Sequence, residues 1–273
     1  MTLVLAVVAG ALIGLSLGAL GGGGSILAVP VLVYLLDQSA SQATTGSLVV
    51  VGTTSLIGAA AAYRSGTVLL ARGATFGVVA IGGAVVGARA SARVSEDVLL
   101  AAFAVLMLLV GALMAWRLLH HGDAEPQHAR RPQLDDPILT FSPTFACACP
   151  RALKVLVTAT VVGLLTGFLG VGGGFLVVPA LLLALALPLE YAVGTSLVVI
   201  TITSAAALVT RASAGTTPDW GVVLTLTIAS ALGAVAGARL ADRVDTRHLS
   251  AAFTVLVLAV ASYTAAQALP ALL

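Results

Sequence analysis

The stretch that decides the fold is Gly14–Pro30, GLSLGALGGGGSILAVP, because the chain carries a second copy of it. Gly163–Pro179 reads GLLTGFLGVGGGFLVVP, begins 149 residues later and is identical at ten of 17 positions. At the same offset, Ser47–Val50 recurs as Ser196–Val199. With one slip of a single residue, the register extends over most of the chain. The sequence therefore predicts a duplicated unit of about 120 residues, an organisation typical of transporters.

The composition identifies the environment of these segments. Of 273 residues, 59% are hydrophobic and 9% are charged, whereas an ordinary soluble domain has about 25% charged residues. These values exclude a soluble globule and a disordered chain. A net charge of +2 gives no basic surface for nucleic acid. The remaining class is a polytopic integral membrane protein in contact with the lipid bilayer.

The apolar segments predict helices, because a bilayer admits only helices or closed barrels and period-two alternation is absent. We expect an all-α transmembrane bundle of two homologous repeats, 1–119 and 151–273, joined by a polar inter-repeat loop, 120–150. The first segment recurs in mid-chain, so we expect it to be retained and not cleaved as a signal peptide. The predicted segments are 2–20, 25–36, 43–62, 74–92, 98–119, 152–169, 174–187, 191–210, 221–240 and 249–269.

The second and seventh segments are short for a membrane crossing, so the glycines are expected to break or turn back the first helix pair of each repeat. If each pair is a re-entrant hairpin, the repeats are inverted, and ten Lys and Arg residues fall on one face and three on the other. A single broken crossing would give parallel repeats and a split of eight to five. The positive-inside rule favours inversion, with the central loop cytoplasmic and both termini outside.

The glycine clusters are the first candidate site. A run of glycines breaks a helix, and the next helix starts with free N–H groups and a positive dipole end that favour an anion. Alternatively, the glycines only permit close packing and the serines bond their own helices. The predicted substrate-binding residues are Gly23, Gly24, Ser25, Gly172, Gly173 and Gly174, with Ser47 and Ser196 as secondary ligands.

The ionisable residues give weaker signals. None lies deep within a predicted segment, so a buried-carboxylate proton relay is not expected. Arginines near segment ends are explained by topology and snorkelling, and the alternative is that they line an anion vestibule. These arginines are Arg64, Arg89, Arg211 and Arg239.

The remaining motifs are read as structural. The spacings Gly83-x-x-x-Gly87 and Gly233-x-x-x-Gly237 predict seams of close helix contact. Cys147, Cys149 and the linker histidines match no zinc spacing, so no metal site or cofactor is expected. The chain has no Walker lysine motif or nucleophile elbow, so we do not expect an enzyme.

The two glycine-rich motifs, each ending in Val-Pro and followed by a Ser-Leu-Val-Val segment, resemble the sulfite exporter TauE/SafE family. The resemblance covers 10–119 and 152–269. It implies transport of small anions, chiefly sulfite, sulfonates and related organosulfur compounds, across a bacterial or archaeal cytoplasmic membrane. The copies differ at Gly22, where the second has Val171, and at Ser25, where it has Gly174.

We therefore expect an exporter of sulfite or an organosulfonate that binds its substrate between the two glycine-rich tips. An uptake carrier or channel on the same scaffold is one alternative. A non-transport membrane protein, either a scaffold or an enzyme using the linker histidines and cysteines, is the other. Both a monomer and a homodimer stay open.

Overall fold

The computed structural model describes residues 2–120, 149–169, 174–184, 187–212, 218–241 and 246–268, and these form helices and short connections without strands. The predicted all-α class is confirmed. Most of the expected inter-repeat loop, with Cys147, lies outside the described residues, as do Gly172 and Gly173. The helices are α1 (Thr2–Leu20), η1 (Gly21–Gly24), α2 (Ser25–Pro30), η2 (Val31–Leu35), α3 (Ala40–Arg64), α4 (Leu70–Ser91), α5 (Glu96–His120), α6 (Cys149–Leu169), α7 (Gly174–Ala184), α8 (Leu189–Ala212), α9 (Trp220–Ala241) and α10 (Thr246–Ala268).

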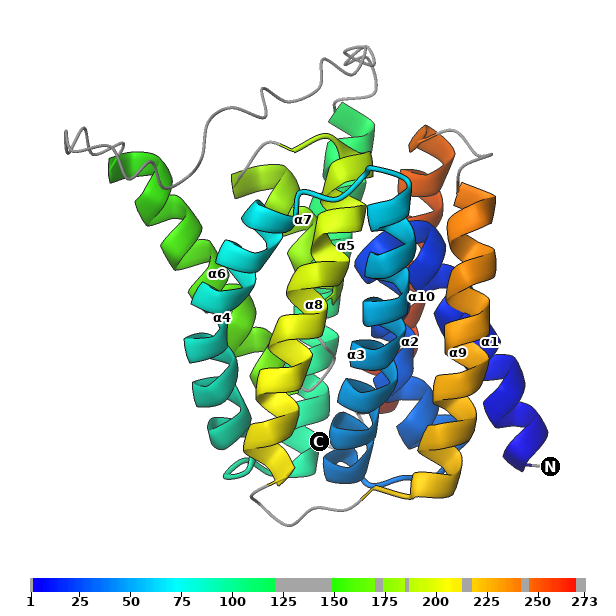
Figure 1. Ribbon diagram of the computed structural model, residues 1–273. Coiled ribbons are helices and arrows are strands. Elements are labelled where there is room, and N and C mark those ends of the chain that lie inside the picture. The colour runs from blue at the N-terminus through cyan, green and yellow to red at the C-terminus, as the bar shows by residue number, and fades with distance from the viewer. Residues whose placement is uncertain are drawn as a thin grey trace.

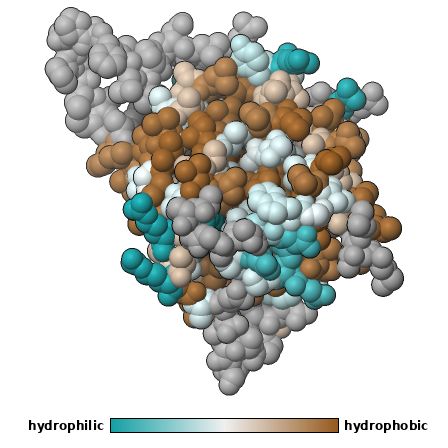
Figure 2. All heavy atoms as spheres, turned by 60° about the horizontal axis from the view of Figure 1, so that its bottom comes forward, coloured by the Kyte–Doolittle hydropathy of each residue, from teal (hydrophilic) through white to brown (hydrophobic). Residues whose placement is uncertain are grey.

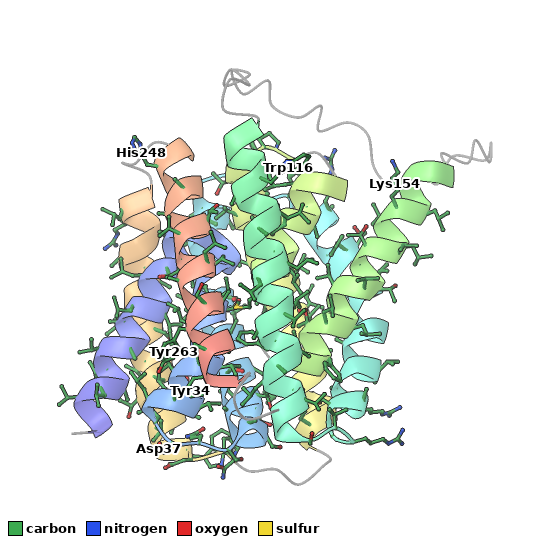
Figure 3. All side chains as sticks on the ribbon, turned by 180° about the vertical axis from the view of Figure 1, so that it is seen from behind. Tyr34, Asp37, Trp116, Lys154, His248 and Tyr263 are labelled. Atoms are coloured by element: carbon green, nitrogen blue, oxygen red, sulfur yellow. The ribbon has the colours of Figure 1, made fainter. Side chains whose placement is uncertain are left out.

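The first helix pair turns back on itself. The N-terminus lies at one end of the bundle in Figure 1, and Asp37, which follows η2, lies at that same end in Figure 3. Gly21 has φ of +67°, a conformation that favours glycine, and it starts the turn between α1 and α2. The pair α1–α2 is therefore a hairpin whose tip lies inside the bundle.

Each half of the chain packs a glycine-containing helix against the other half. Along α1, a methyl group at Gly14 or Gly18 would overlap the α9 backbone at Ser230 or Ala234. Along α6, Gly163 and Gly167 approach the α4 backbone at Ala80 and Ala84 in the same way. The two halves thus share one core instead of forming separate units.

The glycine seams predicted on α4 and α9 are confirmed. A methyl group at Gly83 would overlap the carbonyl of Thr160 on α6, and one at Gly233 would overlap the carbonyl of Ala11 on α1. Without side chains at these positions, the backbones approach closely enough for extensive van der Waals contact, which drives helix association in lipid.

Helices α3 and α8, equivalent in the two sequence copies, cross at the centre of the bundle in opposite directions. Gly52 of α3 faces Ser204 of α8, whereas Gly58, further along α3, faces Leu197, which is earlier in α8. Figure 1 shows these two helices side by side in the middle of the molecule.

The surface is that of a multi-pass membrane protein. Within the described ranges, four helices are long and apolar enough to span a bilayer: Ala40–Arg64, Leu70–Ser91, Tyr191–Arg211 and Trp220–Leu240. Large apolar side chains such as Val209 are exposed on the outside, and in Figure 2 brown apolar residues cover the flanks while teal hydrophilic residues gather toward the end brought forward. Lipid contact explains this outward display of apolar groups.

The two ends of the bundle are named by residues labelled in Figure 3. The Asp37 end holds the start of α3 and the last turns of α4 and α8, whose residues Thr44, Ser91 and Arg211 are joined by hydrogen bonds. The Lys154 end holds Lys154, Trp116 and His248.

Candidate functional site

The two glycine-rich tips touch each other. A Cβ atom at Gly174, the first residue of α7, would lie 2.7 Å from Ser25 Oγ and 2.8 Å from Gly22 Cα. Ser25 and Gly174 occupy equivalent positions of the two sequence copies, 149 residues apart. Two serines here would collide, so the difference between the copies has a steric reason. The contact brings the start of α7 beside the start of α2.

The residues predicted at the first tip are already engaged in packing. Ser25 is buried, and its hydroxyl donates a 2.7 Å hydrogen bond to the carbonyl of Gly22. Gly24 lies against its own hairpin, because a side chain there would overlap Ile13 and Leu17 of α1. Gly23 lies in the η1 turn between them. These contacts define the shape of the tip, and the binding of substrate by these residues stays a prediction.

The predicted secondary ligands are buried and bonded to their own helices. The Ser47 hydroxyl donates a 2.9 Å hydrogen bond to the Thr44 carbonyl. The Ser196 hydroxyl donates a 2.7 Å hydrogen bond to the Val193 carbonyl. Ser196 also lies beside the first tip, since a Cβ atom at Gly21 would be 3.1 Å from its Oγ. Each hydroxyl oxygen keeps its lone pairs, but an anion would need a hydrogen bond from the hydroxyl proton. That proton is already donated to a backbone carbonyl.

Arg211, in the last turn of α8, is a buried cation that joins three other helices. Only 7% of the residue is exposed. Its Nη1 donates a 2.9 Å hydrogen bond to Thr44 Oγ1 on α3. Its Nη2 donates a 2.7 Å hydrogen bond to Ser91 Oγ on α4. Nη2 also donates to the carbonyls of Gly167, at 3.2 Å, and Phe168, at 3.4 Å, in the last turn of α6.

The Arg211 guanidinium has no carboxylate partner among the described residues, and its buried Nε has no hydrogen-bond partner there. Terminal carbonyls of α6 carry only a partial negative charge, so they stabilise the cation incompletely. A full positive charge in a low-dielectric interior attracts an anion strongly. An anion beside the Arg211 guanidinium, next to the last turn of α6, would therefore be stabilised electrostatically.

The expectation that Arg211 snorkels to the membrane surface is wrong, and the anion-lining alternative fits its position better. Arg64, Arg89 and Arg239 are exposed, as snorkelling predicts. Arg211 differs because its helix ends against the α6 terminus and polar residues of α3 and α4.

A comparison of the two sequence copies could have identified this network. At the offsets of 149 and 150, Arg211 aligns with Ala62 and Ser91 aligns with Ala241. Thr44 aligns with Val193. All three polar members of the network are therefore replaced by apolar residues in the other copy. The three side chains that these hydrogen bonds join thus differ from the other copy as a set.

Further buried polar groups lie at the Asp37 end. The Tyr34 hydroxyl and both polar atoms of the Gln38 side chain are buried without partners among the described residues. Tyr34 packs edge-on against Tyr263, with ring centroids 5.7 Å apart. Figure 3 labels the two residues next to each other. Gln38 aligns with Leu187 of the second copy. The polar character of the Asp37 end thus extends beyond Arg211.

The bundle of hydrophobic helices contains a broken-helix hairpin, and its buried arginine has no carboxylate partner among the described residues. These features are typical of a membrane protein of the transporter class. The family model described as sulfite exporter TauE/SafE matches residues 6–264. The chain belongs to the TauE/SafE family.

Relatives in two bacteria carry transporter names. A probable membrane transporter protein of Xylella fastidiosa (strain 9a5c) is 31% identical, with 96% of this chain and 94% of the relative covered. The probable membrane transporter protein YunE of Bacillus subtilis (strain 168) is 27% identical over 91% of this chain and 92% of its own length. No solved structure matches the chain.

Proposed function

We propose that this protein exports sulfite or an organosulfonate across the cytoplasmic membrane, with the substrate held between the two glycine-rich tips. The family supports membrane transport of a small anion. In this proposal the backbone amides around Gly23, Gly24, Ser25, Gly172, Gly173 and Gly174 bind the oxyanion, and Ser47 and Ser196 assist. Arg211 joins these predicted ligands because it is the buried positive charge nearest the end of α6.

The observation that carries the proposal is the unpaired charge of Arg211. A buried cation is costly in a membrane protein unless it has a partner or a task. Here four acceptors solvate it, but none of them is a carboxylate. A small anion would complete its neutralisation, which favours anionic over neutral or cationic substrates.

The direction of transport follows from the electrical driving force. An inside-negative potential favours the exit of an anion by about 2.3 kcal/mol per charge per 100 mV. Export then needs no coupled ion. We place the central loop in the cytoplasm and treat the chain as a carrier, not an enzyme. The inverted-repeat arrangement belongs to this proposal, supported by the opposite directions of α3 and α8.

The test is sulfite flux in proteoliposomes of the purified protein with the membrane potential clamped at either sign. We expect flux to follow the potential and to reverse with it. A parallel series with ethanesulfonate distinguishes the inorganic anion from an organosulfonate. Flux of both anions that ignores the potential would contradict uncoupled export, and flux of neither would contradict the substrate class.

A further inference from the structure

Two buried serines at the crossing of α3 and α8 stand apart from the other buried hydroxyl groups. Ser55 is 0% exposed and Ser204 is 1% exposed, and neither Oγ atom has a hydrogen-bond partner in the described part of the chain. They occupy equivalent positions of the two sequence copies, 149 residues apart. The same unpaired group thus occurs twice, once on each of two equivalent helices.

A serine inside a helix ordinarily donates its proton to a carbonyl three or four residues earlier. Other buried hydroxyl groups of this chain do so: Ser47, Ser91, Thr166, Ser196, Thr203 and Ser230. Ser55 and Ser204 have the same local option and do not take it. Their O–H groups are therefore available as donors in the protein interior, where an unpaired polar group is costly.

The two serines lie in one seam. Gly52 faces α8, with a Cβ position 3.1 Å from Ser204 Cβ, and Gly58 faces Leu197 of the same helix. Ser55 is three residues from each glycine and lies on the same stripe of α3. Gly52, which lies opposite Ser204, is three residues from Ser55. This separation is about 4.5 Å along the axis of α3, at 1.5 Å per residue.

We propose that Ser55 and Ser204 form a second oxyanion-binding station between α3 and α8, at which the substrate stops as it crosses the bundle. This inference rests on the proposed function. Two free hydroxyl donors match an anion that has several oxygens, because each oxygen can accept a hydrogen bond. The hydroxyl groups supply these bonds without adding a fixed positive charge to the site. A station without a cation binds more weakly than one at Arg211, which permits onward movement.

A sodium ion is the main competing ligand for two serines. Sodium needs oxygen lone pairs, and helical carbonyls around this seam are engaged in the helix ladder. Neither serine lies beside a carboxylate in the sequence, and the segments 43–62 and 191–210 contain none. Each serine hydroxyl offers lone pairs as well as a proton. The lack of a carboxylate in these two segments is therefore what favours an anion over a cation.

The test compares Ser55→Ala, Ser204→Ala and the double variant with the wild type, using sulfite and ethanesulfonate as probes. Affinity is measured by titration calorimetry in detergent, and stability by thermal unfolding without ligand. We expect the weaker of the two binding events in the titration to lose affinity about tenfold in each single variant, since hydrogen bonds to charged groups are strong. The unfolding temperature should stay the same or rise, because alanine removes an unpaired buried group.

Ser230→Ala is the matched control. Its hydroxyl is also buried, but it is bonded to Thr54 at 2.7 Å and to the Thr227 carbonyl. This variant should lose stability and keep its affinity for the probe. The opposite responses of Ser230 and the serine pair separate a structural hydroxyl group from a ligand-binding one.

Three results would overturn the second station. Loss of stability in the Ser55 and Ser204 variants with unchanged affinity would indicate a structural bond. Unchanged affinity together with unchanged stability would indicate that the two serines contribute to neither binding nor folding. Sodium binding in the same calorimeter that the variants lose, with sulfite binding unchanged, would indicate a cation site. Failure of the wild type to bind either probe would instead contradict the proposed function itself.

Discussion

The Asp37 end and the Lys154 end of the bundle differ in chemistry. At the Asp37 end, Arg211 joins α8 to Thr44 of α3 and Ser91 of α4. The residues at equivalent positions of the other copy are Ala62, Val193 and Ala241. The glycine seams, by contrast, are alike in both halves. Both halves thus contain the close helix packing, whereas the Arg211 network is described at the Asp37 end.

This difference separates two requirements of a carrier. Close packing of α1 on α9 and of α6 on α4 builds the scaffold, and both halves need it equally. A positive charge that attracts the substrate, by contrast, is needed at one place in the bundle. The buried Arg211 also strengthens the Asp37 end, because its hydrogen bonds join α8 to α3, α4 and α6 there.

The largest effect is expected where the halves are alike. Gly83→Val and Gly233→Val should each cost more than about 3 kcal/mol of stability, because the new side chain meets a backbone carbonyl that cannot move aside. Yield of folded protein and thermal unfolding in detergent measure this. The control is Gly82→Ala, at a position with no atom within 4 Å, which should be neutral or slightly stabilising. A large loss in only one half would break the equivalence of the seams.

The next effect concerns the charge that distinguishes the ends. Arg211→Gln should lower sulfite flux about 10- to 100-fold, the range expected when a hydrogen bond to a charged group is lost. Arg211→Lys should be intermediate, since lysine keeps the charge but not the planar fork. Arg89→Gln removes an exposed arginine near the end of α4 and should keep normal flux. Equal losses in the two glutamine variants would indicate a general surface-charge effect.

A smaller effect is expected for one acceptor of the network. Thr44→Val introduces the residue of the other copy, and should lower flux about threefold to tenfold through the loss of one bond to Arg211. Thr45→Val is a matched control, because both threonines donate to the Ser41 carbonyl but only Thr44 has a hydrogen bond from Arg211. Proteoliposome flux at equal protein content gives the comparison, and identical fluxes would remove Thr44 from the network.

The smallest effect is expected for Gln38. Gln38→Leu introduces the residue of the other copy and removes two buried polar atoms that have no partners in the described residues. Thermal unfolding should show a gain of about 1 kcal/mol, with flux within about twofold of the wild type. A loss of stability would mean that the amide has a structural task.

Much of the fold follows from the sequence because its signals are local or repeated. The length of the apolar runs predicts the helices, and the glycine spacings around Gly83 and Gly233 predict the seams. The candidate site is harder to predict, because burial of a residue near a helix end depends on its neighbours. Arg64 and Arg211 both end long apolar helices, yet only Arg211 meets the end of α6. Likewise, no local pattern distinguishes the unpaired Ser55 from the bonded Ser47.

The most direct test of the central claim is the stabilisation of the protein by sulfite. Thermal unfolding in detergent would be followed with and without sulfite for the wild type, Arg211→Gln and Arg89→Gln. If Arg211 supplies the charge that binds the anion, sulfite should stabilise the wild type and Arg89→Gln but not Arg211→Gln. An equal stabilisation of all three proteins would contradict the account.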